Sequence, residues 1–161
     1  MRWWRHAITD RGSVDAALSP AVLDRIEQRI ATAEASHAGQ IVFAIEPALP
    51  AARVFAKLSP RDRALEVFGL LRVWDTEHNN GVLVYLLLAD RDVEIVADRG
   101  IHRKVGDAAW QAICAAMEAA FRDGRYEEGA LAGIEAISAR LAAAFPKGDG
   151  PNELPNRPVV I

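Results

Sequence analysis

The longest apolar run of the chain, Val82 to Leu88, constrains the fold more than any other feature. Its residues show no alternation of polar and apolar side chains, which is typical of a strand covered on both faces. The run is also far shorter than the ~20 residues that a helix needs to cross a bilayer. We therefore expect a central strand in a sheet with helices packed on both faces.

Two further runs predict the partners of this strand. The turn residues Asp90 to Asp92 lead directly into Val93–Val96, and so short a connection predicts an antiparallel hairpin. A β-branched and aromatic run, Ile41–Ile45, predicts an earlier strand. If it lies in the same sheet, its connection to the central strand is a right-handed parallel crossover.

Helix signals separate these strands. The pairs Ser19-Pro20 and Ser59-Pro60 predict helix starts, because serine caps free N–H groups and proline suits the first helical position. Apolar residues at intervals of three to four predict the remaining helices. The expected helices run from Pro20 to a stop at Gly39, over 50–58, from Pro60 to about Arg72, from an N-cap at Asp107 to Asp123-Gly124, and over 126–145.

This order of elements predicts an α/β fold, a small three-layer α/β/α sandwich around a mixed sheet. With 161 residues, 51% of them hydrophobic, the chain fits one domain with a substantial core. We expect an N-terminal extension over 1–18, the domain over 19–145, and an extended tail over 146–161 that is rich in proline, glycine and asparagine.

Charge and cysteine content exclude several classes of protein. A net charge of −3 with both signs interspersed argues against a nucleic-acid binder with a basic surface. The single cysteine, Cys114, has no disulfide partner and is interpreted as a small buried residue. No apolar segment of a secretory signal follows the charged start. We expect a soluble, cytoplasmic protein without an integral membrane segment.

The four tryptophans carry separate predictions. Trp74 and Trp110 are expected in the core. Trp3 and Trp4 lie beside arginines, and three alternatives remain open for them: packing back on the domain, touching a partner, or resting on a membrane surface. Packing back is the interpretation that we favour.

A candidate site arises at one end of the predicted sheet. In a hairpin, the start of the first strand and the end of the second meet, so the loop from Asp75 to Asn80 should face Asp98 and, through the next turn, Asp107. Carboxylate and amide oxygens on loops suit Ca²⁺ or Mg²⁺. We predict these four residues as metal ligands. Helix capping and turn formation are the structural alternative for each.

Other polar groups predict less. Glu46, Asp90 and Asp92 lie at the opposite end of the sheet, where a tight turn requires such residues without any ligand. Glu34, Ser36 and His37 lie at a helix end without a positioned third member, so we predict no catalytic triad. Zinc, dinucleotide and P-loop motifs are missing from the sequence.

Several of these residues together resemble the TPM domain family, in its stand-alone bacterial type. The similar features are the strand opening Asn80-Gly-Val-Leu-Val84, the return strand Val93-Glu-Ile-Val96 and the helical phrase Phe121-Arg-Asp-Gly-Arg-Tyr126. The chain departs from many members by having Asp98-Arg-Gly100 where they have glycine, an aromatic residue and glycine. The resemblance covers about 19–145 and implies an α/β/α sandwich.

The resemblance also implies divalent-metal binding in some members and a proposed phosphatase activity in plant members. Our leading hypothesis is a TPM-like accessory domain that binds Ca²⁺ or Mg²⁺ and acts by contact with an unidentified protein partner. The alternative is a metal-assisted phosphomonoesterase, in which the ion polarises a phosphoryl oxygen and Arg99 or His102 helps to bind the charge.

Overall fold

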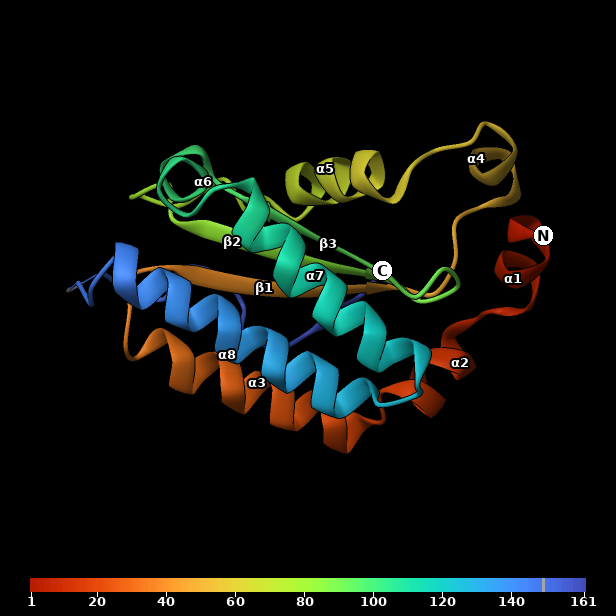
Figure 1. Cartoon of the computed structure of the whole chain (residues 1–161), viewed down its shortest axis with the longest axis horizontal. Coiled ribbons are helices and arrows are strands. Elements are labelled where there is room, and N and C mark those ends of the chain that lie inside the picture. The colour runs from red at the N-terminus through yellow and green to blue at the C-terminus, as the bar shows by residue number, and fades with distance from the viewer. Residues whose placement is uncertain (149) are drawn as a thin grey trace.

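The computed structural model describes residues 1–148 and 150–161. Helices and strands alternate along these residues in the order that Figure 1 shows. The helices are α1 (Arg2–Ile8), α2 (Arg11–Ala17), α3 (Pro20–Glu34), α4 (Ala51–Phe55), α5 (Pro60–Leu70), α6 (Arg99–Val105), α7 (Asp107–Arg122) and α8 (Tyr126–Ala144). The strands are β1 (Gln40–Glu46), β2 (Gly81–Leu87), β3 (Asp92–Ala97) and β4 (Val159–Val160).

The strands form one mixed sheet in the order β3-β2-β1-β4. Strands β1 and β2 are parallel, from Gln40 opposite Gly81 to Glu46 opposite Leu87, and α4 and α5 form the crossover between them. Strands β2 and β3 form the antiparallel hairpin. Both the parallel crossover and the hairpin that the sequence predicted are therefore confirmed.

Every residue of β1 and β2 is buried, as the continuous apolar run predicted. Side chains of α3, α7 and α8 pack with one face of these strands, and α5 covers the other (Figure 1). Alternate residues serve the two faces: Val84 points into the larger core and Tyr85 into the smaller. The three-layer α/β/α arrangement follows, since neither face of the central strands can be left to water.

The segment between β3 and α7 differs from the prediction. Asp98 accepts a hydrogen bond from the Arg99 N–H and begins α6, a helix that the sequence analysis did not predict. Gly106, at φ 83°, ends α6 and is the N-cap of α7, so Asp107 is the first helical residue and not the cap. Helix α3 also ends earlier than predicted, at Glu34.

One of the two tryptophans predicted in the core is there. Trp110 on α7 is buried, but Trp74 is 49% exposed, so that prediction was wrong. Trp74 follows the end of α5 in a turn, and the Arg72 guanidinium lies 5.8 Å from its ring centroid. This stacking gives the ring a partner outside the core.

Both chain ends contribute to the packed structure. In the N-terminal segment, Val14 and Leu18 are fully buried in the larger core. In the tail, Val159 and Val160 pair in parallel with β1 and form the last strand of the sheet. No described helix combines the length and apolar character needed to cross a membrane.

Candidate functional site

The amino end of the sheet, where β1 and β2 begin, gathers the loops that carry the predicted site. The Asp98 N–H donates a hydrogen bond to the Gly81 carbonyl, 2.9 Å away. The Gln40 N–H donates in the same way to the Asn80 carbonyl at 2.9 Å. The loop before β2 and the turn after β3 therefore lie at the same end of the sheet, as hairpin geometry requires.

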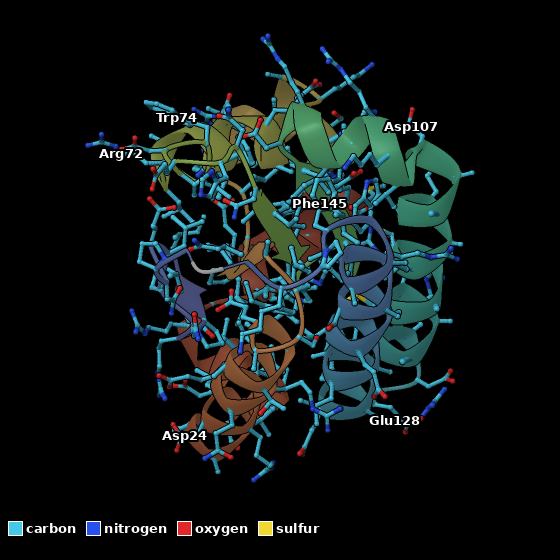
Figure 2. All side chains as sticks on the ribbon, turned by 90° about the vertical axis from the view of Figure 1, so that its left-hand side faces the viewer. Asp24, Arg72, Trp74, Asp107, Glu128 and Phe145 are labelled. Carbon is cyan, nitrogen blue, oxygen red and sulfur yellow. The ribbon has the colours of Figure 1, made fainter. Side chains whose placement is uncertain are left out.

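Two of the four predicted ligands point their carboxylates to other partners. Asp75 pairs with Arg72 at 2.5 Å, and both side chains are largely exposed. Asp107 lies 3.4 Å from His102 Nε2 and is also exposed. Figure 2 looks onto this end of the molecule and shows Arg72 and Asp107 on opposite sides of it. Asp75 and Asp107 thus lie apart at the periphery.

The other two, Asn80 and Asp98, each place a side-chain oxygen in a buried position. The Asn80 side-chain N–H donates to the Ala38 carbonyl at 2.5 Å, whereas its Oδ1 has no hydrogen-bond donor among residues 1–148 and 150–161. Asp98 Oδ1 accepts the α6 capping bond, and its Oδ2 is buried without a partner. A buried acceptor without a donor costs about 1–3 kcal/mol. These two oxygens are therefore available for a ligand.

The four predicted residues do not converge as a preformed cluster. None of their side chains is bonded to another of the four among the described residues. Nor do three or more histidine, cysteine, aspartate or glutamate side chains from 1–148 and 150–161 gather in a metal-binding arrangement. A cation at this end would thus rely on amide and backbone oxygens and on water as well as carboxylates.

A pocket of about 170 Å³ opens beside Asn80. The end of α3, the start of β1 and the C-terminal tail form its walls. Gln40 holds the tail across it, because its Oε1 accepts the N–H groups of Glu153 and Leu154, both at 2.8 Å. The polar side chains of the lining are Glu34, His37, Gln40, His78, Asn80, Lys147, Asn152 and Glu153.

Burial shifts the ionisation of two groups in this pocket. Burial raises the pKa of Glu34 from 4.5 to about 7, although the carboxylate accepts a hydrogen bond from the Ile41 N–H at 2.8 Å. Burial lowers the pKa of His37, against the smaller opposing effect of the Gly39 backbone. The side chain is only 3% exposed, and neither ring nitrogen has a well-formed hydrogen bond to a described residue. The pocket can therefore hold a carboxyl group that exchanges a proton near neutral pH beside a neutral imidazole.

Sequence reasoning considered Glu34 and His37 only as members of a triad and set them aside. Their position beside Asn80 depends on α3 ending at Glu34, so that His37 turns into the sheet end. In the sequence, the available indication of this pocket was a histidine shortly before the first buried strand. No local sequence pattern indicated that the tail, through Glu153, would line this pocket.

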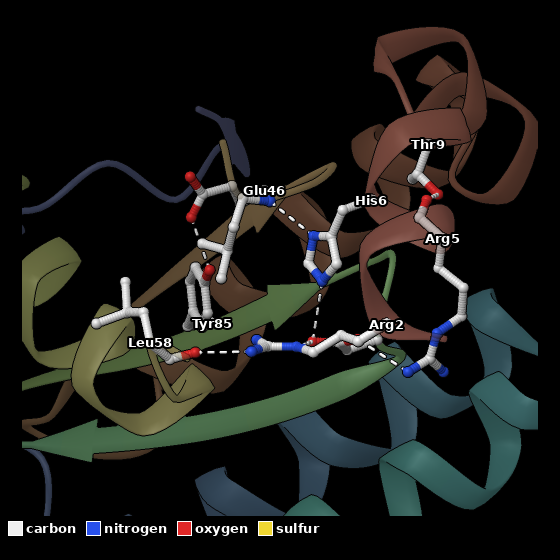
Figure 3. Close-up of polar contacts among 9 residues, drawn as sticks. Arg2, Arg5, His6, Thr9, Glu46, Leu58 and Tyr85 are labelled. Atoms are coloured by element: carbon white, nitrogen blue, oxygen red, sulfur yellow. Dashed lines mark hydrogen bonds and ion pairs between the residues drawn. The ribbon is translucent and has the colours of Figure 1, made fainter. Parts of the chain in front are cut away.

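The carboxyl end of the sheet, where β1 and β2 end, is the second polar region, and Figure 3 shows it. The buried Glu46 carboxylate accepts the Tyr85 hydroxyl at 2.6 Å and two Arg63 N–H groups at 2.9 and 3.0 Å. Burial raises the pKa of Tyr85, and its bond to Glu46 raises it further. The pair with Glu46 raises the pKa of Arg63. These three side chains form one buried network, and Arg63 Nη1 extends it to the exposed Glu66.

Asp90, in the hairpin turn, organises the rest of this end. Its carboxylate is within 2.8 Å of Arg2 Nε, 3.2 Å of Arg5 Nη2 and 3.2 Å of His6 Nε2. His6 Nδ1 in turn accepts the Leu49 N–H at 2.9 Å (Figure 3). These contacts fasten α1 to the body of the domain, which accounts for Asp90 without a ligand.

Comparisons with known proteins agree with this architecture. A family model of the TPM domain matches residues 13–140. The solution structure of BA42 from the psychrophilic bacterium Bizionia argentinensis is similar, with 31% identity and a TM-score of 0.78 over 89% of this chain and 95% of that one. The N-terminal domain of a protein from P. gingivalis shares the fold at 23% identity, with a TM-score of 0.67 over 83% of each chain. A search of curated proteins gave no match.

Proposed function

Because this chain belongs to the TPM domain family, we propose that it is an accessory domain that binds Ca²⁺ or Mg²⁺ at the amino end of its sheet. The bound ion would fix the loop conformation through which the domain contacts a protein partner. The observation that carries the proposal is the pair of buried oxygens without donors, Asn80 Oδ1 and Asp98 Oδ2. Both belong to hard ligands of the kind that these cations prefer.

The two oxygens come from residues that flank a single backbone contact. Asn80 directly precedes Gly81, and Gly81 accepts the Asp98 N–H. A cation bound to either oxygen would offset the cost of leaving it buried without a donor. Asp75 and Asp107 add negative charge at the same end of the sheet, which attracts a cation even though both carboxylates lie at the periphery.

A calcium titration followed by amide NMR shifts tests the proposal. We expect saturable shifts at Asn80 and Asp98 and a substantial loss of affinity in Asp98→Asn, because the amide removes the charge but keeps the shape. Asp123→Asn is the matched control, since Asp123 is an exposed aspartate that pairs with Arg125 just after α7. Absence of shifts at Asn80 and Asp98 in millimolar calcium or magnesium would refute the site.

A phosphomonoesterase is the second candidate, favoured by the pocket beside Asn80. A carboxyl group with a pKa of about 7, Glu34, can protonate a leaving group, and Lys147 supplies positive charge for a phosphate. We expect magnesium-dependent hydrolysis of a phosphomonoester to fall in both Asp98→Asn and Glu34→Gln. Activity that is unchanged in both variants would assign the hydrolysis to another site.

A further inference from the structure

Helix α1 is turned with its polar side chains inward and its apolar side chains outward. His6 is buried and Arg2 is half-buried, whereas Trp3, Trp4 and Ile8 are all exposed. An amphipathic helix on a globular protein normally buries its apolar face. The reversed arrangement leaves two tryptophans and an isoleucine exposed, with no described element covering them.

The inward polar contacts hold the helix in this orientation. Arg2 reaches Asp90 at 2.8 Å and the Leu58 carbonyl at 2.9 Å, and His6 lies between Asp90 and the Leu49 N–H (Figure 3). Rotating α1 to bury its tryptophans would break these bonds. Packing of Trp3 and Trp4 back on the domain, which the sequence analysis favoured, is therefore wrong.

Helix α4 presents a further exposed aromatic side chain at the same extremity of the molecule. It packs beside α1 at the carboxyl end of the sheet, where both helices form one extremity of the molecule (Figure 1). Its last residue, Phe55, is 71% exposed, and Trp4 is 57% exposed. Trp3 and Trp4 contact each other edge to face, with ring centroids 5.7 Å apart. We call Trp3, Trp4, Ile8 and Phe55 the aromatic tip.

The sequence around the aromatic tip is basic, although the whole chain is acidic. Residues 1–9 and 47–58 contain Arg2, Arg5, Arg53 and Lys57 but no aspartate or glutamate. Asp90 and Glu66, from neighbouring elements, pair with three of these cations. Asp92 also lies close enough to Arg2 for electrostatic interaction, and the four positive charges still exceed these three negative ones. The tip is thus locally cationic in a chain of net charge −3.

We propose that the aromatic tip docks peripherally on an anionic membrane surface. Tryptophan side chains favour the boundary between lipid headgroups and acyl chains, and nearby arginine and lysine are attracted to anionic lipid. The tip consists of side chains that protrude at one extremity, which suits insertion into a deformable interface. The positive charge complements the lipid phosphates, and this complementarity favours a membrane over an apolar protein surface.

Vesicle sedimentation of the full chain tests this docking. We expect binding to vesicles of phosphatidylcholine mixed with phosphatidylglycerol, weaker binding at high salt, and little binding to phosphatidylcholine alone. The double variant Trp3→Ser/Trp4→Ser should lower the partition coefficient at least about tenfold, because it removes the two aromatic side chains that enter the interface. Trp74→Ser is the matched control, because Trp74 is comparably exposed but precedes β2 at the other end of the sheet.

The result can also go against the proposal. Equal binding of the wild type and the double variant would overturn it, as would failure of the wild type to bind anionic vesicles. A mass by light scattering that corresponds to a dimer in the wild type and a monomer in the double variant would identify a second copy, and not a membrane, as the occupant. Circular dichroism of the double variant verifies that the exposed substitutions leave the fold intact.

Discussion

The two ends of the sheet differ in how their central buried side chains are bonded, although Arg2 Nη2, His6 Nε2 and Asp92 Oδ1 at the carboxyl end also lack hydrogen-bond partners among the described residues. At the carboxyl end, the Glu46 carboxylate accepts hydrogen bonds from the Tyr85 hydroxyl and from Nε and Nη2 of Arg63. At the amino end, both ring nitrogens of His37 and Oδ1 of Asn80 are buried without a hydrogen-bond partner in the part of the chain that the structure describes. Satisfied buried groups stabilise a fold, whereas unsatisfied ones destabilise it unless a ligand supplies the missing bond.

The difference distinguishes polar side chains that hold the fold together from polar side chains that remain free to bind a ligand. The sequence suggested both ends as candidate ligand sites, because both are rich in aspartate, asparagine and glutamate. Only the partners in space show that Asp90 fastens α1, whereas Asn80 faces an open pocket. For this reason the candidate site lies at the amino end, although ligands of parallel sheets customarily bind beyond the carboxyl ends of the strands.

The largest expected change in the free energy of unfolding comes from breaking the Glu46 network at the carboxyl end. Glu46→Gln should lower the free energy of unfolding by about 3 kcal/mol, because it removes the buried counter-charge of the largely buried Arg63 and leaves only the exposed Glu66. Urea denaturation at an unchanged m-value measures the loss. Glu66→Gln is the matched control, since Glu66 pairs with the same arginine but is exposed; it should cost below about 1 kcal/mol. Equal losses would show that burial does not distinguish the two pairs.

An intermediate effect is expected from pH at the amino end. The folded-state pKa of Glu34 is about 7, above its ordinary value of 4.5, so the folded state binds more protons than the unfolded state between these values. Stability should therefore fall as pH rises through this window, by about 2 kcal/mol after allowance for partial exposure. Glu34→Gln should remove this dependence while its side-chain carbonyl still accepts the Ile41 N–H.

Thermal unfolding of wild type and Glu34→Gln at pH 5 to 8 measures the difference. Asp92→Asn is a useful control, because burial raises the pKa of Asp92 only to about 6. Its contribution should be lost at lower pH than that of Glu34. Parallel pH profiles for the wild type and Glu34→Gln would contradict the assignment to Glu34.

The smallest expected effect has the opposite sign. His37→Leu should raise the free energy of unfolding by about 1 kcal/mol, because it replaces a buried imidazole without partners by an apolar side chain. His78→Leu, in the exposed part of the same pocket, should change stability by less than about 0.5 kcal/mol. A destabilised His37→Leu would show that this imidazole is structural, and the contrast between the two ends would weaken.

Local patterns predicted the central architecture because those patterns are caused by burial. The continuous apolar run of β2 indicated helices on both faces, and the short Asp90 turn indicated the hairpin. The Ser-Pro pairs placed the starts of α3 and α5, where Ser19 and Ser59 accept backbone N–H bonds as predicted. Each of these features is decided within a few residues of the chain.

The predictions that were wrong depended on distant neighbours. Trp74 was expected in the core on size alone, but the chain had already turned away from the sheet after α5. Asp107 was expected as an N-cap because aspartate suits that position, but α6 ends at Gly106 and leaves the glycine in the capping position. The sequence neither predicted α6 nor indicated how α1 would be oriented.

The sequence by itself determined the layers of this TPM domain and the sheet end at which its loops meet, because apolar periodicity and turn chemistry are local properties. Only the tertiary structure decided which polar side chains are hydrogen-bonded or ion-paired within the protein and which remain available to a ligand. Arg2 and Asp90 are 88 residues apart in sequence, and Gln40 binds the tail more than 110 residues later. Partnerships at such separations are set by the packing of the whole chain, and so is the outward face of α1.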